Sequence, residues 1–69
     1  MKSQIVLYIY EKLLLKEKVT TNELLGEFDV SVRTIRRYIS EINAYLFNFN
    51  KGKEVVFNKT RGTYILKDI

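Results

Sequence analysis

The sequence predicts an α+β fold that is mostly α-helical, with three helices followed by a C-terminal β-hairpin. Apolar residues recur at helical spacing in three stretches of the first 46 residues. Two short β-like runs then follow, with a polar loop between them. A chain of 69 residues has room for one domain only, so we expect a single domain over residues 1–69.

The first helix is expected over residues 3–17, where Lys16, Glu17 and Lys18 end the apolar pattern. Its inward face is predicted to consist of Val6, Ile9, Tyr10, Leu13 and Leu14. Val19 then stands alone between polar residues, which is compatible with a very short strand.

A second, short helix is expected over about residues 21–28. Thr20-Thr21-Asn22-Glu23 forms a capping box, in which Thr20 accepts from the amide of Glu23 and the Glu23 carboxylate returns to the amide of Thr20. Leu24, Leu25 and Phe28 are expected to face inward.

The third helix is predicted over residues 32–46, with Ser31 as its N-cap. Its buried stripe is formed by Ile35, Ile39, Ile42 and Leu46, which are spaced four, three and four apart. The two β-like runs are residues 54–58 and 63–67, and residues 59–62 between them read as the hairpin loop.

Two helices joined by the short turn Asp29-Val30-Ser31 match a helix-turn-helix, and the hairpin after them would be its wing. Such a motif places its second helix in the major groove of DNA. At about 100° per residue, Arg33 and Arg37 lie opposite the buried stripe of this helix, flanked by Thr34, Arg36 and Ser40. The guanidinium fork suits both guanine edges and phosphates.

Double-stranded DNA is therefore the expected partner. The candidate DNA-binding residues are Ser31, Arg33, Thr34, Arg36, Arg37, Tyr38 and Ser40 on the predicted recognition helix, with Lys59 and Arg61 in the wing. The alternatives are that the arginines form an ordinary solvated face, or that the winged helix serves as a protein-interaction module.

Composition agrees with this function. Twelve Lys and Arg against eight Asp and Glu give a net charge of +4, and the pI of about 9.5 is typical of nucleic-acid binders. With neither Cys nor His in the chain, no thiolate metal site and no histidine base can form, so we expect no cofactor and no enzymatic activity. The longest apolar run, Ile5 to Tyr10, is far too short to span a membrane, and we expect a cytoplasmic protein.

The run from Val19 to Ile42 resembles the N-terminal winged helix-turn-helix domain of DeoR-type and WYL-type bacterial regulators. The shared residues are Glu23-Leu24, Val30-Ser31 and Thr34-Ile35-Arg36-Arg37, and Gly62, Tyr64 and Leu66 resemble the end of the wing. The resemblance implies a transcriptional regulator or its DNA-binding part. Asp29 stands where the family commonly has Gly, and Tyr38 where it commonly has Asp.

DNA-binding proteins of this type commonly pair to bind two half-sites. Ile5, Tyr8 and Leu15 are expected on the side of the first helix opposite its inward face, and a contiguous apolar stripe often marks an interface. We therefore predict a homodimer through Ile5, Tyr8 and Leu15, with Phe47 and Phe49 as rival anchors.

Overall fold

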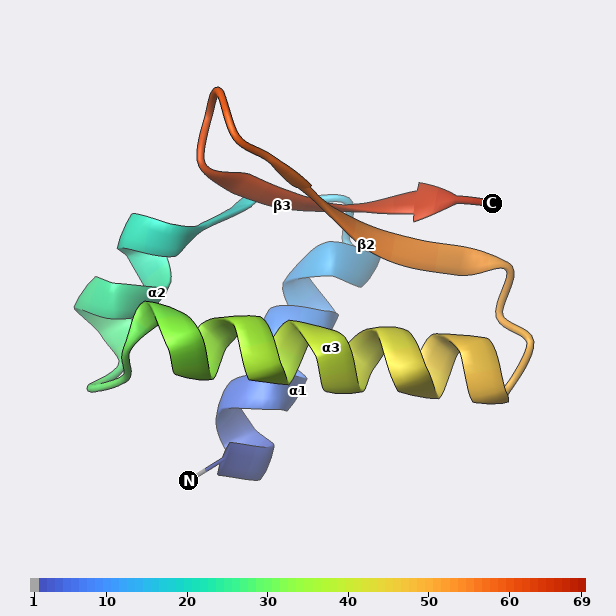
Figure 1. The fold of residues 1–69 in the computed structure, drawn as a ribbon, viewed down its shortest axis with the longest axis horizontal. Coiled ribbons are helices and arrows are strands. Elements are labelled where there is room, and N and C mark those ends of the chain that lie inside the picture. Colours follow the sequence, from blue (N-terminus) through green and yellow to red (C-terminus); the bar gives the residue numbers. More distant parts are fainter. Residues whose placement is uncertain (1) are drawn as a thin grey trace.

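The computed structural model describes residues 2–69, which form three helices and three strands. In chain order these are α1 (Lys2–Leu14), β1 (Val19–Thr20), α2 (Thr21–Glu27), α3 (Val32–Asn48), β2 (Lys53–Asn58) and β3 (Thr63–Asp68). In Figure 1, α3 runs along the length of the molecule, α1 passes behind it and the β2–β3 hairpin lies above both. The predicted fold of three helices with a C-terminal wing is confirmed.

The sheet has the order β1-β3-β2, and both pairings are antiparallel. In the hairpin, Val55 lies opposite Leu66 and Phe57 opposite Tyr64. The isolated Val19 does form a short strand, in which it pairs with Tyr64 on the other side of β3. The wing is thereby joined to the segment that leads into α2.

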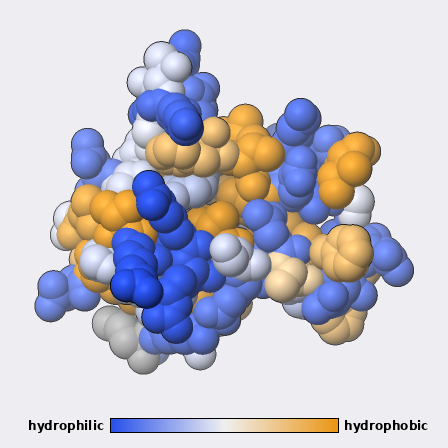
Figure 2. All heavy atoms as spheres, in the orientation of Figure 1, coloured by the Kyte–Doolittle hydropathy of each residue, from blue (hydrophilic) through white to orange (hydrophobic). Residues whose placement is uncertain are grey.

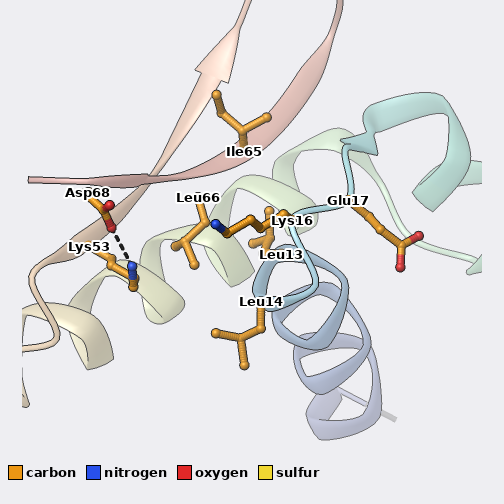
Figure 3. Close-up of a pocket in the computed structure, with 8 residues that line it drawn as sticks. All are labelled: Leu13, Leu14, Lys16, Glu17, Lys53, Ile65, Leu66 and Asp68. Atoms are coloured by element: carbon orange, nitrogen blue, oxygen red, sulfur yellow. Dashed lines mark hydrogen bonds and ion pairs between the residues drawn. The ribbon is translucent and has the colours of Figure 1, made fainter.

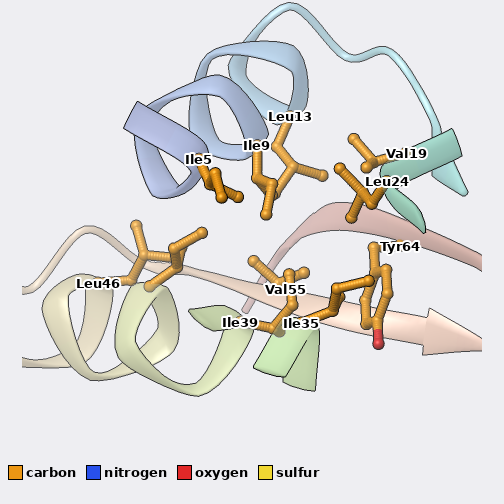
Figure 4. Close-up of a cluster of buried hydrophobic side chains, with 11 residues drawn as sticks. Ile5, Ile9, Leu13, Val19, Leu24, Ile35, Ile39, Leu46, Val55 and Tyr64 are labelled. Carbon is orange, nitrogen blue, oxygen red and sulfur yellow. The ribbon is translucent and has the colours of Figure 1, made fainter. Parts of the chain in front are cut away.

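One core unites the three helices and the sheet (Figure 4). It consists of Ile5, Ile9 and Leu13 from α1, Leu24 from α2, the predicted stripe Ile35, Ile39, Ile42 and Leu46 from α3, and Val19, Val55 and Tyr64 from the sheet. Every element therefore contributes at least one buried apolar side chain to the same cluster.

The inward face of α1 differs from the one predicted. It is formed by Ile5, Ile9 and Leu13 at intervals of four, whereas Leu14 is 51% exposed. The prediction was ambiguous because α1 carries apolar residues on nearly every side, so helical spacing alone does not single out one face.

The prediction that Ile5, Tyr8 and Leu15 form one exposed stripe for dimerisation is therefore wrong. Ile5 is only 2% exposed and belongs to the core. Tyr8 packs edge-on against Phe28, with the ring centroids 5.1 Å apart, and its hydroxyl donates to Glu23 at 3.1 Å. Leu15 alone is well exposed, at 64%, and it follows the end of the helix.

Two helices end in the same way, and neither end lies where it was predicted. After α1, the amides of Lys16 and Glu17 donate to the carbonyls of Leu13 and Lys12, and Lys16 has a φ of 61°. After α3, Asn50 has a φ of 51°, and the amides of Asn50 and Lys51 donate to Phe47 and Leu46. Both are Schellman motifs, which stop a helix through one left-handed residue. Asn tolerates that conformation, whereas Lys16 gave no such signal in the sequence.

Asn43 joins α3 to the edge strand β2. Its side-chain Oδ1 accepts from the amide of Val55 at 2.7 Å, and its Nδ2 donates to the carbonyl of Val55 at 3.2 Å. Because β2 lies at the edge of the sheet, these backbone groups have no neighbouring strand to bond to. One side chain therefore satisfies both groups and fixes the hairpin against α3.

We expect Asn43→Ala to lower the free energy of unfolding by about 1–3 kcal/mol, because it leaves the two partly buried groups of Val55 without partners. Urea unfolding followed by circular dichroism measures this loss. Asn48→Ala, at an exposed position in the last turn of the same helix, is the matched control. Equal stability of the two variants would contradict the structural role of Asn43.

Candidate nucleic-acid interface

The helix-turn-helix consists of α2, the turn over residues 28–31 and α3. The amide of Phe28 closes α2 on the carbonyl of Leu24 at 3.0 Å, and the amide of Val30 then donates to the carbonyl of Phe28 at 3.0 Å. The side chain of Val30 is half-buried and packs against the core. The turn therefore sets the direction in which α3 leaves α2.

Ser31 caps α3, as predicted. Its backbone is extended, and its hydroxyl accepts from the amide of Thr34 at 3.2 Å. The hydroxyls of Ser31 and Thr34 are also within hydrogen-bond distance, at 3.1 Å. Both side chains are therefore engaged with each other at the N-terminus of the helix, where free amides and the helix dipole favour an anion.

The arginine face of α3 is exposed. Burial of the isoleucine stripe leaves Arg33, Arg36, Arg37 and Ser40 open to solvent. Figure 2 shows strongly hydrophilic side chains gathered over the N-terminal half of α3, on the side turned to the viewer. We use the name arginine face for Arg33, Arg36 and Arg37.

The charge of this face is not neutralised by ion pairs. Among residues 2–69, the ion pairs all have lysine as their cation: Lys2–Glu41, Lys12–Glu23 and Lys53–Asp68. Glu41 is the acid that follows the arginines on α3, and its carboxylate lies 2.9 Å from Lys2 of α1. The three guanidinium groups are therefore free to bind an external anion.

Tyr38 has a different setting from the arginines. It is half-buried and packs against the core beside a hollow of about 260 Å³, which is lined by Lys2, Ile5, Glu27, Phe28, Asp29, Val30 and Tyr38. Its ring thus supports the junction of α1, the turn and α3, and only part of it is available to a ligand.

Tyr64 connects the wing to the arginine face. Burial raises the pKa of its phenol, whereas the positive charge of Arg36 and a side-chain hydrogen bond with Thr21 act in the opposite direction. The pKa of Tyr64 is thus influenced both by a charge on α3 and by the first residue of α2. In the sequence, Tyr64 stands out only by the resemblance of the wing, and its spacing does not indicate an influence from Arg36.

The wing loop has a defined shape of its own. The side-chain oxygen of Asn58 accepts from the amides of Thr60 and Arg61, at 3.0 and 3.3 Å. The amide of Gly62 donates to the carbonyl of Asn58 at 2.8 Å, and the φ of +64° at Gly62 is one that glycine adopts without strain. Lys59 and Arg61 are exposed on this loop.

The base of the wing is tied to α2 by the backbone. The amide of Thr21 donates to the carbonyl of Gly62 at 3.1 Å. In Figure 1 the tip of the hairpin lies at the same end of the molecule as α2 and the N-terminus of α3. The structure therefore brings the predicted wing residues and the predicted recognition helix to one end of the molecule.

The acid of the α2 capping box is shared with α1. Thr20 accepts from the amide of Glu23 at 2.9 Å, as predicted. The Glu23 carboxylate also binds Lys12 and Tyr8 of α1, and its hydrogen bond with the backbone of Thr20 is the smallest of the influences on its pKa. These bonds, with that of Lys12 contributing most, lower the pKa of Glu23. The carboxylate thus joins α2 to α1, a contact that helical spacing could not reveal.

A further hollow lies away from the arginine face and the wing loop. It has a volume of about 290 Å³ and lies between the end of α1 and the hairpin, with the ion pair of Lys53 and Asp68 beside it (Figure 3). Lys53 lowers the pKa of Asp68.

In the part of the chain that the structure describes, no three acidic, Cys or His side chains are grouped as a metal site would require. None of the helices within residues 2–69 has the length and apolar character needed to cross a membrane.

The fold and the exposed arginine face together define a winged helix-turn-helix protein. Residues 6–64 match a protein family described as HTH domain, and the chain belongs to this family. The match includes both helices of the motif and most of the hairpin, and it supports DNA as the partner. No curated protein and no solved structure shows significant similarity to the chain.

We expect Glu23→Gln to destabilise the domain at neutral pH, because the carboxylate that holds Lys12 and Tyr8 is replaced by a neutral amide. The pKa of Glu23 is lowered on folding, so its contribution is present above its unfolded-state pKa and is lost as the pH falls through the folded-state value. The difference in melting temperature between the wild-type protein and the variant should therefore shrink below about pH 4.

Glu27→Gln, at an exposed carboxylate of the same helix, is the control for this measurement. A Glu23→Gln variant whose melting temperature follows that of the wild-type protein from neutral to acid pH would contradict the role assigned to the carboxylate.

Proposed function

We propose that this protein binds double-stranded DNA in a sequence-specific manner and acts as a transcriptional regulator or as the DNA-binding part of one. The observation that carries the proposal is the arginine face, three unpaired guanidinium groups on the second helix of a helix-turn-helix. In this arrangement α3 enters the major groove through its N-terminal half.

The residues of α3 divide into two roles. Arg33 and Arg37 lie farthest from the buried stripe and would bind base edges, for which the bidentate pairing of Arg with guanine is the commonest specific contact. Arg36, which lies farther from the centre of the exposed side of α3, would bind a phosphate. Ser31, Thr34 and Ser40 would add hydroxyl contacts to the backbone, and the exposed part of Tyr38 would border them.

The wing supplies a second contact. Lys59 and Arg61 are held on a loop whose amides are bonded to Asn58, so both cations start from a fixed backbone. They would bind the phosphate backbone or enter the minor groove beside the site that α3 occupies.

The resemblance to DeoR-type and WYL-type regulators supports a regulatory role for this DNA binding. The residues that carry the resemblance include the cap Ser31 and the pair Arg36-Arg37, which the structure places at the N-terminal half of α3. A regulator of this type acts where the chromosome lies, so we propose that the protein works in the cytoplasm of a bacterial cell or of one infected by a phage.

We expect Arg37→Ala to weaken binding by about 1–3 kcal/mol to the duplex that the wild-type protein selects from a random-sequence library. The variant should also lose preference at one base pair, because a bidentate base contact is removed. Fluorescence anisotropy with the selected duplex and with a mixed-sequence duplex separates the two effects.

Lys67→Ala is the matched control for Arg37→Ala. It also removes one exposed cation, but Lys67 lies at the end of β3 that is remote from the wing loop. If the library yields no preferred sequence, or if both variants lose the same affinity, sequence-specific recognition by α3 is refuted. If the protein shows no salt-dependent binding to mixed-sequence DNA, the winged helix is better explained as a protein-interaction module.

We expect simultaneous replacement of Lys59 and Arg61 by Ala to weaken binding to all duplexes alike. The slope of log K against log salt concentration should become shallower by about 0.9 for each phosphate contact that is lost. The measurement is a salt titration from low to physiological ionic strength. A slope equal to that of the wild-type protein would show that the wing does not touch DNA.

A further inference from the structure

An apolar face lies where α1 and α3 are neighbours. Leu7, Tyr10 and Leu14 follow one side of α1 at intervals of three and four. Tyr45 on α3 packs against Tyr10, with ring centroids 6.0 Å apart, and Phe49 at the end of α3 packs against Tyr45 at 4.9 Å. We use the name α1–α3 face for these five residues.

The α1–α3 face contains both a hollow and protruding side chains. The hollow has a volume of about 380 Å³ and is lined by Val6, Leu7, Tyr10, Glu41, Ile42 and Tyr45. Leu7 and Phe49 stand out beside it, each 64% exposed. An interface with two-fold symmetry needs one patch that is complementary to itself. A hollow next to a projecting Leu and Phe fulfils that condition.

The charges around the face do not oppose such pairing. Glu41, the acid that lines the hollow, is already bound to Lys2 at 2.9 Å. At the rim, the Lys51 ammonium lies 5.9 Å from the centre of the Tyr45 ring, and Glu11 is exposed on α1 between Leu7 and Leu14. Because the rim carries both signs, two copies can face one another without bringing only like charges together.

The exposed area is sufficient for a weak dimer. Leu7, Leu14, Tyr45 and Phe49 are 64, 51, 43 and 64% exposed. For side chains of this size, burial on both copies would remove about 1,000 Å² from solvent, which is at the lower limit for a specific interface. Self-association in the micromolar range or weaker is therefore expected.

The face also leaves the arginines accessible. Tyr45 follows Arg37 by eight residues, so it lies about 80° around the helix and about 12 Å further along its axis. A second copy bound at the hollow would therefore not cover the N-terminal half of α3.

We propose that the α1–α3 face binds a second copy of this chain about a two-fold axis. The proposal deepens the proposed function, because two paired domains could bind two half-sites of one operator, but its test needs no DNA.

The test is sedimentation equilibrium of the free protein from about 10 µM to 1 mM. The wild-type protein should show a monomer–dimer equilibrium, and Leu7→Glu should raise the dissociation constant at least tenfold by placing a charge in the apolar interface. Leu15→Glu is the matched control, since Leu15 is also 64% exposed but lies outside the hollow. It should leave the dissociation constant within about twofold of the wild-type value.

A second pair of variants tests whether the effect of Leu7→Glu is due to the interface or only to a change in structure around Leu7. Phe49→Glu should weaken dimerisation in the same way, whereas Phe47→Glu should not, because Phe47 is 81% exposed beside a different hollow. Circular dichroism shows that each variant is folded. A wild-type protein that stays monomeric to about 1 mM, or equal effects of the variants and their controls, would overturn the proposal.

Failure of this proposal can be told apart from failure of the proposed function. Binding of each variant to a mixed-sequence duplex reports on the arginine face and the wing, which lie outside the α1–α3 face. A monomeric protein that binds DNA would reject the interface and retain DNA binding. A wild-type dimer that Leu7→Glu disrupts but that has no affinity for DNA would support the interface and reject DNA binding.

Discussion

Burial of one side of α3 is the constraint on which the rest of the structure depends. Ile35, Ile39, Ile42 and Leu46 are between 0 and 7% exposed, and they meet side chains from α1, α2 and the sheet. Truncating one such residue costs about 2–5 kcal/mol, whereas a whole domain is stable by only about 5–15 kcal/mol. Rotation of α3 about its axis is thus excluded, because it would expose the stripe. The direction of Arg33 and Arg37 follows from the core alone, without any contact that holds the arginines themselves.

A second constraint fixes the wing relative to this helix. A two-stranded hairpin by itself is only marginally stable in water. Here three contacts of different kinds hold it: Asn43 bonds to the backbone of β2, the amide of Thr21 bonds to Gly62, and Tyr64 is buried between β1 and α3. Because Thr21 begins α2 and Asn43 belongs to α3, the same contacts join the wing to both helices of the helix-turn-helix. The arginine face and the loop with Lys59 and Arg61 can then act as one rigid surface.

Sequence patterns predicted those parts of the structure that depend on neighbours along the chain. The Ser31 cap, the isoleucine stripe of α3, the strand at Val19 and the hairpin loop all rest on local spacing, and all are found. What could not be predicted depends on partners that are distant in sequence. Glu23 binds Lys12 and Tyr8 of α1 in addition to its capping contacts, and Asn43 binds Val55 twelve residues away. Asn is a poor helix former, so its presence in the middle of α3 indicates that its side chain has a partner outside the helix. Helical spacing alone does not identify that partner.

The core-facing side of α1 was predicted wrongly because apolar residues on this helix point in several directions. Ile5, Ile9 and Leu13 face the core, Tyr8 faces α2, and Val6 and Tyr10 approach α3, so three directions around α1 are occupied within this chain. A helix that is apolar on all sides is normally enclosed on all sides. In the remaining direction, Leu7 borders the hollow beside α3 and Leu14 borders the hollow beside the hairpin, but both side chains stay largely exposed. Single exposed apolar residues need no explanation, but these two continue into Tyr45 and Phe49 of α3. The unexplained part of the sequence of α1 thus coincides with the one side of the helix on which a second molecule could pack.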